Sequence, residues 1–306
     1  MPGPGVVLWA TGREGLAQGL SPESLAATHP GWRKDALDFG PWQALSRPWC
    51  GDCGCDGWWV SQAGAAAPTR IVVSGPCTSV MDVARPLAEA GGLSAWDSAL
   101  AVSQRSGRGQ LRRHWESPPG NLYACLVLPQ APPEFDSLVP LLLGECLAGY
   151  FAGRGLAMRL KWPNDLIHNG VKVGGLLVEE RRGVVTAGIG VNLVSCPSPE
   201  ALREEHAVPA GHLGQCFTPL GLWRSLVDFL RICYEAALHR GSPQAVAAGI
   251  ETKLAWLGEC VMVREGGVAP YRARLMGLAP DGALRLRPMD GTGVEKILTS
   301  GSIWPG

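Results

Sequence analysis

Two lysines and a pair of glycines within residues 159–179 are the residues whose types and spacing most favour the binding of a reacting ligand. This segment reads RLKWPNDLIHNGVKVGGLLVE, and it contains Lys161 and Lys172, two of only five lysines in the 306-residue chain. Gly174 and Gly175 interrupt a run that is otherwise apolar, which is typical of a strand that a ligand or another backbone approaches closely. A lysine ammonium beside bare backbone N–H groups suits an anionic ligand.

A second segment, SQRSGRGQ at residues 103–110, also favours an anionic ligand. The glycines on either side of Arg108 let the backbone approach a phosphate or carboxylate, while the guanidinium supplies bidentate donors. By itself such a Gly-Arg-Gly triplet is a weak signal, because it often forms only a turn. Here Arg112, Arg113 and Trp115 follow, so we expect a mobile cationic loop with an aromatic base.

Together these two segments resemble the signature of the biotin protein ligases. The resemblance rests on KWPND and KVGGLLVE within residues 161–179, and on the upstream run that begins at residue 103 and continues through Trp115 to the GNLY of residues 120–123. It implies an α+β fold with a class II aminoacyl-tRNA-synthetase-like (biotin/lipoate ligase) mixed sheet and flanking helices. It also implies a small C-terminal SH3-like β-barrel.

The reaction implied by this resemblance has two steps and uses ATP. Biotin attacks the α-phosphate of ATP to give biotinyl-5′-AMP and pyrophosphate, and a lysine of an acceptor protein then attacks the adenylate and releases AMP. The natural acceptor is a biotin carboxyl carrier protein or carrier domain of a carboxylase. Mg²⁺ accompanies ATP through its phosphates, and we expect no dedicated protein site for it.

Three residues carry the catalytic roles that the resemblance implies. Lys172 is the first choice, because it is placed to bridge the biotin carboxyl and the α-phosphate, where negative charge builds up. Arg108, with the amides of Gly107 and Gly109, holds the phosphate from the other side. Asp165 either orients or deprotonates the incoming lysine, or it is a structural carboxylate in the turn after the proline.

The resemblance also divides the remaining positions between the two substrates. The expected biotin contacts are Ser79, Val80, Met81, Gln104, Gly107, Gly175 and Gly188. The expected ATP and adenylate contacts are Arg108, Gly109, Gln110, Arg113, Trp115, Lys172 and Asn192. Small residues at positions 188 and 190 leave one face of a strand open, where a planar ring could lie. Ser79 has an alternative role as a plain helix cap, and Trp115 has an alternative role in packing under the closed loop. Lys161 either binds the acceptor or the triphosphate, or pairs with a carboxylate.

Three positions depart from the family pattern. Val80 and Met81 are apolar where the family is polar, and Gln110 stands where the family usually has an arginine associated with retaining the activated intermediate. Three alternatives therefore stay open: another acyl-adenylate ligase of the lipoate type, a non-enzymatic biotin sensor or DNA-bound repressor, and a catalytically degenerate biotin-binding protein.

The elements that must position these residues alternate between strand and helix patterns from residue 70 onward. A strong hairpin signal, Asn169-Gly170, lies between two β-rich runs. We expect strands near residues 71–73, 100–104, 121–128, 157–160, 166–167, 171–178 and 184–189. We expect helices over 80–90, 140–151 and 220–238, the last capped by Thr218. Short strands at 261–263, 271–276 and 283–286 predict the C-terminal barrel.

The chain length suits two domains or one large domain with an appendage. We expect a Trp/Gly/Pro-rich segment of open role at residues 1–66, a catalytic domain at 67–250 and an SH3-like domain at 251–306. Residues 1–66 lack a basic recognition helix, and Lys+Arg and Asp+Glu are both 27 in the whole chain. We therefore expect no nucleic-acid partner.

Cysteine usage and hydropathy favour a cytoplasmic protein. We find no basic-then-apolar leader and no apolar run of membrane-spanning length, and most of the ten cysteines stand singly in apolar surroundings. Cys50, Cys53 and Cys55 have metal-chelating spacing without a fourth ligand nearby, so reduced thiols, a structural metal and a redox pair all stay open. The acceptor and the oligomeric state are open too, with a homodimer as the family's common arrangement.

Overall fold

The computed structural model describes residues 4–46, 57–63, 69–110, 113–198, 208–214, 216–239, 241–291 and 293–306. Contacts between residues divide the chain into two compact units. The first comprises Met1–Gln130, Gly174–Pro197 and Gly211–Asp228, and the second comprises Ala131–Val173, Ser198–Ala210 and Phe229–Gly306. The predicted Cys50, Cys53 and Cys55 cluster lies outside the described residues.

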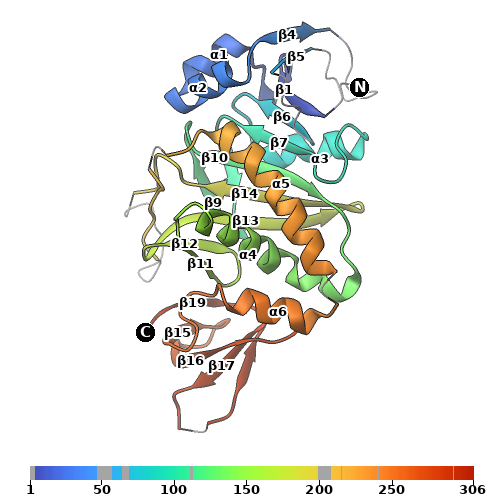
Figure 1. Ribbon diagram of the computed structural model, residues 1–306. Helices are drawn as coiled ribbons and strands as arrows, with labels where there is room; N and C mark the ends of the chain where they lie inside the picture. Colours follow the sequence, from blue (N-terminus) through green and yellow to red (C-terminus); the bar gives the residue numbers. More distant parts are fainter. Residues whose placement is uncertain are drawn as a thin grey trace. The chain divides into compact units, whose positions relative to one another are not determined.

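A mixed sheet forms the centre of the first unit, with its strands in the order β13-β14-β10-β7-β6-β1-β5-β4 (Figure 1). The pairs β1–β6 and β6–β7 are parallel, and the other neighbouring pairs with a recorded register are antiparallel. The strands are β1 (Gly5–Trp9), β4 (Trp42–Leu45), β5 (Trp58–Ser61), β6 (Arg70–Ser74), β7 (Ser98–Ala101), β10 (Leu122–Leu128), β13 (Val171–Arg181) and β14 (Val184–Val191). This confirms the expected mixed sheet.

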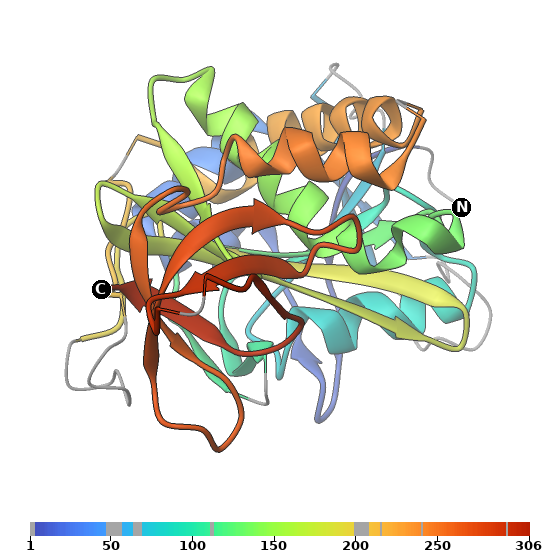
Figure 2. The same ribbon diagram turned by 90° about the horizontal axis from the view of Figure 1, so that it is seen from below.

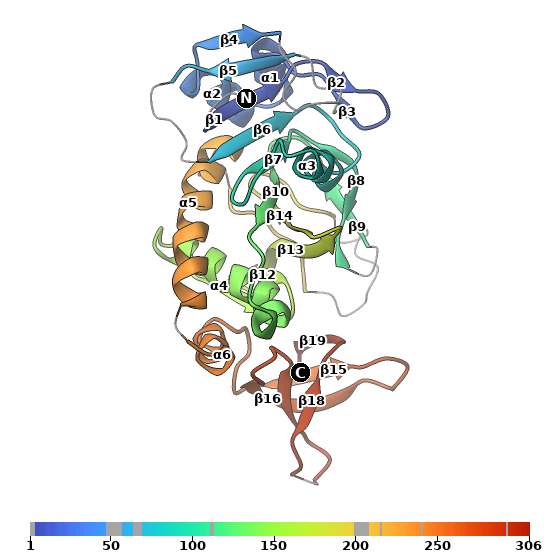
Figure 3. The same cartoon turned by 90° about the vertical axis from the view of Figure 1, so that its right-hand side faces the viewer.

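Helices cover both faces of this sheet, as Figure 3 shows for α3 and α5. Ala99 and Ala101 of β7 pack into an apolar cluster with α3. The intervening positions point the other way, and there Trp223 of α5 donates from its indole Nε1 to the Ser98 hydroxyl at 2.8 Å. The helices of this unit are α1 (Pro22–Thr28), α2 (Pro30–Asp38), α3 (Val80–Glu89) and the first turns of α5 (Pro219–Leu238).

Two short ribbons complete the first unit. One pairs β2 (Gly12–Arg13) with β3 (Ala17–Gln18), and the other pairs β8 (Gln104–Arg108) with β9 (His114–Ser117). The second of these contains the arginine loop expected from the sequence.

The described part of residues 1–66 extends the sheet of the first unit. Strand β1 pairs in parallel with β6, which lies beyond residue 66 in the chain, and β5 and β4 follow at the sheet edge. The helices α1 and α2 have only 7 and 9 residues. Helices this short give too few turns for a clear 3.6-residue period, which is why the sequence did not predict them.

The second unit contains a five-stranded antiparallel sheet in the order β18-β17-β16-β15-β19 (Figure 2, red). Its strands are β15 (Cys260–Arg264), β16 (Tyr271–Leu278), β17 (Leu284–Pro288), β18 (Lys296–Leu298) and β19 (Ser302–Pro305). The three strands expected here are confirmed, and this sheet is consistent with the SH3-like domain. The unit also contains β11 (Met158–Lys161), β12 (Asp165–His168), η3 (Pro133–Leu138), α4 (Val139–Ala152) and α6 (Pro243–Glu251).

The apolar helix α4 forms part of the core of the second unit. Together with η3 it gives the helical stretch Pro133–Ala152, which is long and apolar enough by composition to cross a membrane, with a mean hydropathy of 1.3. However, 67% of that window is buried within the structure, as in the core helix of a globular domain.

The structure confirms the predicted Asn-Gly hairpin, and it agrees in part with the expected core positions of the isolated cysteines. Asn169 and Gly170 have φ values of 49° and 78°, the two positive angles that a type I′ turn requires. The seven cysteines in the described part of the chain are all free thiols, and Cys77, Cys125 and Cys146 among them are buried.

A distant side chain supplies hydrogen bonds at the beginning of α5. The helix begins at Pro219, directly after Thr218 as expected, and the buried carboxylate of Asp35, in α2, accepts the N–H groups of Leu220 at 2.8 Å and Gly221 at 3.1 Å. Thr218 hydrogen-bonds to the same carboxylate, yet burial is the larger effect and raises the pKa of Asp35 to about 6. A side chain 185 residues away in sequence thus supplies the cap.

Replacing this carboxylate should change how stability depends on pH. Because the Asp35 pKa rises from 3.8 unfolded to about 6 folded, the folded state binds the proton more tightly between these values. Stability relative to an Asp35→Asn variant should therefore fall by about 3 kcal/mol as pH rises through this window.

Urea unfolding at several pH values measures this difference. The variant Glu14→Gln, which removes an exposed carboxylate elsewhere in the first unit, should keep the wild-type slope. If the difference in unfolding free energy between wild type and Asp35→Asn stays constant or widens with rising pH, the raised pKa of Asp35 is contradicted.

Candidate active site

The N-terminus of α3 is capped by a side chain from β8. Gln104 Oε1 accepts from the Val80 N–H at 2.8 Å, and its Nε2 donates to the Ser117 hydroxyl at 2.8 Å. Ser79 occupies the N-cap position, is 1% exposed and makes no side-chain cap hydrogen bond. The plain-cap alternative for Ser79 is therefore wrong, and its biotin contact stays a prediction.

The glycine face of β14 is covered rather than open. A Cβ on Gly188 would lie 2.9 Å from the sulfur of Met81, and a Cβ on Gly190 would lie 2.9 Å from the Trp115 indole. Alternate residues of a strand share one face, so Met81 and Trp115 both rest on the side that these glycines leave bare. In this structure two large side chains use the missing Cβ positions on the face that was expected to be open, and the biotin contact of Gly188 stays a prediction.

The predicted arginine loop is, in its described part, a paired ribbon. Gly107 lies so close to Trp115 O that a Cβ there would collide with it. Gly109 donates its N–H to Arg113 O at 2.8 Å, and the Arg113 N–H donates to Gln110 O at 3.1 Å. The described positions on either side of residues 111–112 are thus hydrogen-bonded to each other, and the mobility of the loop stays a prediction. Arg112 lies outside the described residues.

Arg108 is held by a carboxylate that no sequence pattern singled out. Its guanidinium pairs with Asp82 in the first turn of α3, with side-chain exposures of 33% for Arg108 and 37% for Asp82. Acidic residues are common in the first turn of any helix because they interact favourably with its dipole, so the residue type alone did not mark Asp82 as a partner.

Two buried asparagines fix the backbone beyond β14. Asn192, expected near the adenosine, donates from Nδ2 to Gly211 O at 3.0 Å. Asn121 was quoted in the GNLY motif without a role, and its Oδ1 accepts the three successive N–H groups of residues 193–195 at 2.9, 3.0 and 3.3 Å. Asn121 thus shapes the segment that follows Asn192, and the nucleotide contact of Asn192 stays a prediction.

In the second unit, one carboxylate holds both lysines of the central motif. Asp165 lies 2.8 Å from Lys161 Nζ and 2.6 Å from Lys172 Nζ. The side chain of Asp165 is 11% exposed, against 15% for Lys161 and 30% for Lys172. The three charged groups that the sequence singled out in this hairpin are therefore in direct contact.

Electrostatics keep Asp165 ionised. Burial acts to raise its pKa, but the ammonium groups of Lys172 and Lys161 and their hydrogen bonds outweigh it, so the pKa lies below the usual 3.8. A carboxylate with a lowered pKa is a weak proton acceptor. Proton abstraction from the incoming lysine is therefore the less supported role for Asp165. Its recorded contacts are with Lys161 and Lys172, and a role in orienting the incoming lysine stays a prediction.

Hydrogen bonds to backbone carbonyls hold the chain at Lys172 and next to Lys161. The Lys172 N–H donates to Pro209 O at 2.7 Å. Trp162, next to Lys161, is 4% exposed and donates from its indole Nε1 to Gly282 O at 2.9 Å. The KWPND turn is thereby anchored to the C-terminal sheet within the same unit.

Removing the shared carboxylate should destabilise the protein. Asp165→Asn leaves two ammonium groups without their counter-charge, and we expect a loss of about 3 kcal/mol in unfolding free energy at pH 7, the lower end for a broken buried pair. Because the folded pKa is lowered, this stabilisation is present above the unfolded value of 3.8 and disappears as pH falls through the folded value.

Denaturant unfolding at pH 7 and at pH 3 measures this effect. The matched control is Glu265→Gln, which removes the partner of Lys296 in an exposed ion pair of the same unit and should change stability little. Equal stability of wild type and Asp165→Asn at pH 7 would contradict a stabilising shared carboxylate.

Comparisons with known proteins agree on one family. Residues 91–194 match the biotin/lipoate A/B protein ligase family, and this range includes the Gly-Arg-Gly segment, both lysines and Asn192. The chain is 32% identical to the biotin–[acetyl-CoA-carboxylase] ligase of Paracoccus denitrificans over 210 residues, which are 63% of this chain and 84% of that relative.

Two solved structures extend the similarity to the fold. The biotin protein ligase from Aquifex aeolicus in complex with biotin and ATP superposes with a TM-score of 0.62 at 25% identity, covering 76% of this chain and 97% of that one. The biotin protein ligase from Leishmania major in complex with biotinyl-5-AMP gives a TM-score of 0.50 at 25% identity, covering 76% and 99%.

Proposed function

The chain belongs to the biotin/lipoate A/B protein ligase family as a biotin protein ligase, and from this premise we propose how its own residues activate and transfer biotin. The observation that carries the proposal is the cluster in which Lys161 and Lys172 share the Asp165 carboxylate. An anionic acyl phosphate requires nearby cations, and this cluster holds two of them within the KWPND and KVGG motifs.

The chemistry follows from the poor reactivity of a carboxylate. A biotin carboxylate oxygen attacks the α-phosphorus of ATP, the bond to the β-phosphate oxygen breaks, and pyrophosphate leaves. The acceptor's lysine amine, having lost one proton, then attacks the acyl carbon and releases AMP. Both steps build negative charge on oxygen, so fixed cations and N–H groups supply most of the stabilisation.

Lys172 is proposed as the cation that bridges the biotin carboxyl and the α-phosphate. With its side chain 30% exposed, it is the more accessible of the two lysines on Asp165. A substrate anion can therefore approach it while Asp165 keeps the ammonium in position. Lys161, at 15% exposure, is proposed to complete the counter-charge of Asp165.

Arg108 is proposed as the second phosphate ligand, held ready by Asp82. The Gly109 N–H is already committed to Arg113 O, so of the two glycine amides expected to help, Gly107 is the one we retain. Trp115, which lies against Gly190, is proposed to form the base of the adenylate site.

The proposal extends to partners and setting. The acceptor is a biotin carboxyl carrier protein or domain, in line with the substrate in the name of the Paracoccus relative. Mg²⁺ is proposed to enter with ATP, held through the phosphates of the nucleotide. The reaction is placed in the cytoplasm, where ATP is supplied.

We further propose that the protein acts without nucleic acid. The described residues among the first 66 build strands of the main sheet and two short helices, and the chain carries no excess of basic charge. A homodimer stays a prediction, to be tested by sedimentation.

Biotin-dependent exchange of pyrophosphate into ATP tests the first step directly. We expect exchange with biotin, none with lipoate, and a loss of about 10²-fold or more in Lys172→Ala, because a fixed cation at the developing charge is removed. Lys34→Ala, an exposed lysine distant in sequence from both motifs, serves as the control and should keep full exchange.

Each other outcome identifies an alternative. Exchange with lipoate in place of biotin would assign the lipoate-type ligase. Biotin binding without any exchange would assign a degenerate site or a sensor, and full exchange in Lys172→Ala would overturn the role of that lysine.

A further inference from the structure

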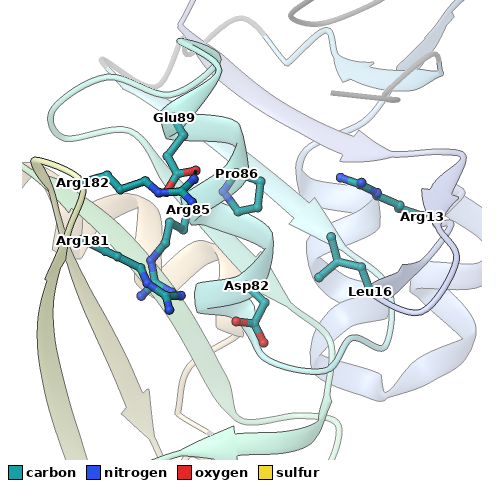
Figure 4. A pocket seen from close by; sticks show the side chains of 8 residues that line it. All are labelled: Arg13, Leu16, Asp82, Arg85, Pro86, Glu89, Arg181 and Arg182. Atoms are coloured by element: carbon teal, nitrogen blue, oxygen red, sulfur yellow. Dashed lines mark hydrogen bonds and ion pairs between the residues drawn. The ribbon is translucent and has the colours of Figure 1, made fainter. Parts of the chain in front are cut away.

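A cavity of about 530 Å³ in the first unit is lined by four arginines. Its walls come from three places in the chain: the β2–β3 ribbon, the outer side of α3, and the turn between β13 and β14 (Figure 4). The lining residues are Arg13, Leu16, Asp82, Arg85, Pro86, Glu89, Arg181 and Arg182. Of these residues, the reaction described above uses only Asp82, which holds Arg108.

One of these arginines is buried without full hydrogen bonding. The side chain of Arg85 is 7% exposed, and its guanidinium donates to Glu179 at 2.6 Å. Its Nε is nevertheless a buried donor that finds no partner within the described part of the chain. Leaving a buried charged donor unpaired is costly, so the wall of this cavity contains a cationic side chain whose hydrogen bonding is incomplete.

The acids around the cavity are already neutralised. Asp82 pairs with Arg108, and Glu89 pairs with Arg182 at 3.3 Å. The lining has four arginines and two acids, a surplus of two positive charges. The partners outside the lining, Arg108 and Glu179, have opposite charges and leave this surplus unchanged. The cavity is therefore a site of unbalanced cationic charge in a chain whose net charge is zero.

Two exposed arginines account for this surplus. Arg13 and Arg181 are both exposed, and within the described residues neither is recorded in an ion pair. Figure 4 places Arg13 on one side of α3, and Arg181 on the other side together with Arg182. A ligand that satisfies both must present anionic groups in more than one direction.

The size of the cavity sets a lower limit on the ligand. About 530 Å³ lies within the ~300–1,000 Å³ that is usual for small-molecule sites, and it exceeds what one tetrahedral ion fills. The planar guanidinium group binds carboxylate and phosphate oxygens through paired N–H donors. We propose that this cavity is a second anion site that binds a small multivalent oxyanion, one bearing two or more phosphate or carboxylate groups.

Isothermal titration with inorganic pyrophosphate and, separately, with citrate tests this site and distinguishes the two oxyanion classes. The pocket variant combines Arg13→Glu with Arg181→Glu, which reverses two exposed charges and leaves the core untouched. We expect binding to the wild type that weakens about tenfold or more for each arginine reversed and also weakens with added salt. Arg33→Glu with Arg272→Glu, two exposed arginines outside the cavity, matches the charge change and should bind as the wild type does.

The Lys172→Ala variant separates this site from the adenylating site. Its cavity is unchanged, so binding of the probe that persists in Lys172→Ala and disappears in the pocket variant assigns the anion to the cavity, whether or not the protein adenylates biotin. Binding lost in Lys172→Ala but kept in the pocket variant overturns the proposal. Absence of binding by both probes to the wild type overturns it as well.

Discussion

The shared carboxylate of Asp165 decides where two of the chain's five lysines can act. A lone buried carboxylate would be costly to ionise, and two neighbouring ammonium groups would repel each other. Placed together, the three groups neutralise most of their charge and leave one positive charge in excess. That surplus is exposed mainly at Lys172, so the ion pair that stabilises the hairpin also produces a fixed cation for an incoming anion.

The same principle recurs at Arg108, which pairs with Asp82 before any substrate arrives. Holding a cation with a carboxylate fixes its position, and electrostatic catalysis depends on groups that need not reorganise during the reaction. Shape is controlled by glycine in the same unit. Because Gly188 and Gly190 have no side chains, Met81 and Trp115 pack directly against the backbone of β14. Large side chains from other elements thus form this wall of the site.

The local parts of this architecture could be predicted from the sequence because each depends on residues close together in the chain. Asn169-Gly170 fixes a turn by its two positive φ angles, and alternating or 3.6-periodic apolar residues mark the strands and the longer helices. The motif around Lys161 and Lys172 likewise brings its charged groups together across three successive strands, β11, β12 and β13. Family, reaction class and most of the site residues follow from these short-range patterns.

Tertiary structure alone decided the contacts between distant segments. Asp35 caps a helix 185 residues away, Gln104 replaces Ser79 as the side chain that caps α3, and Asp82 holds Arg108. None of these pairs has a spacing that a single chain reveals, because a carboxylate or amide can meet any donor that folding brings within about 3 Å. The sequence determined which chemical groups are present and their local geometry. Which of them pair, which are buried and which keep a surplus charge was set by the folded chain.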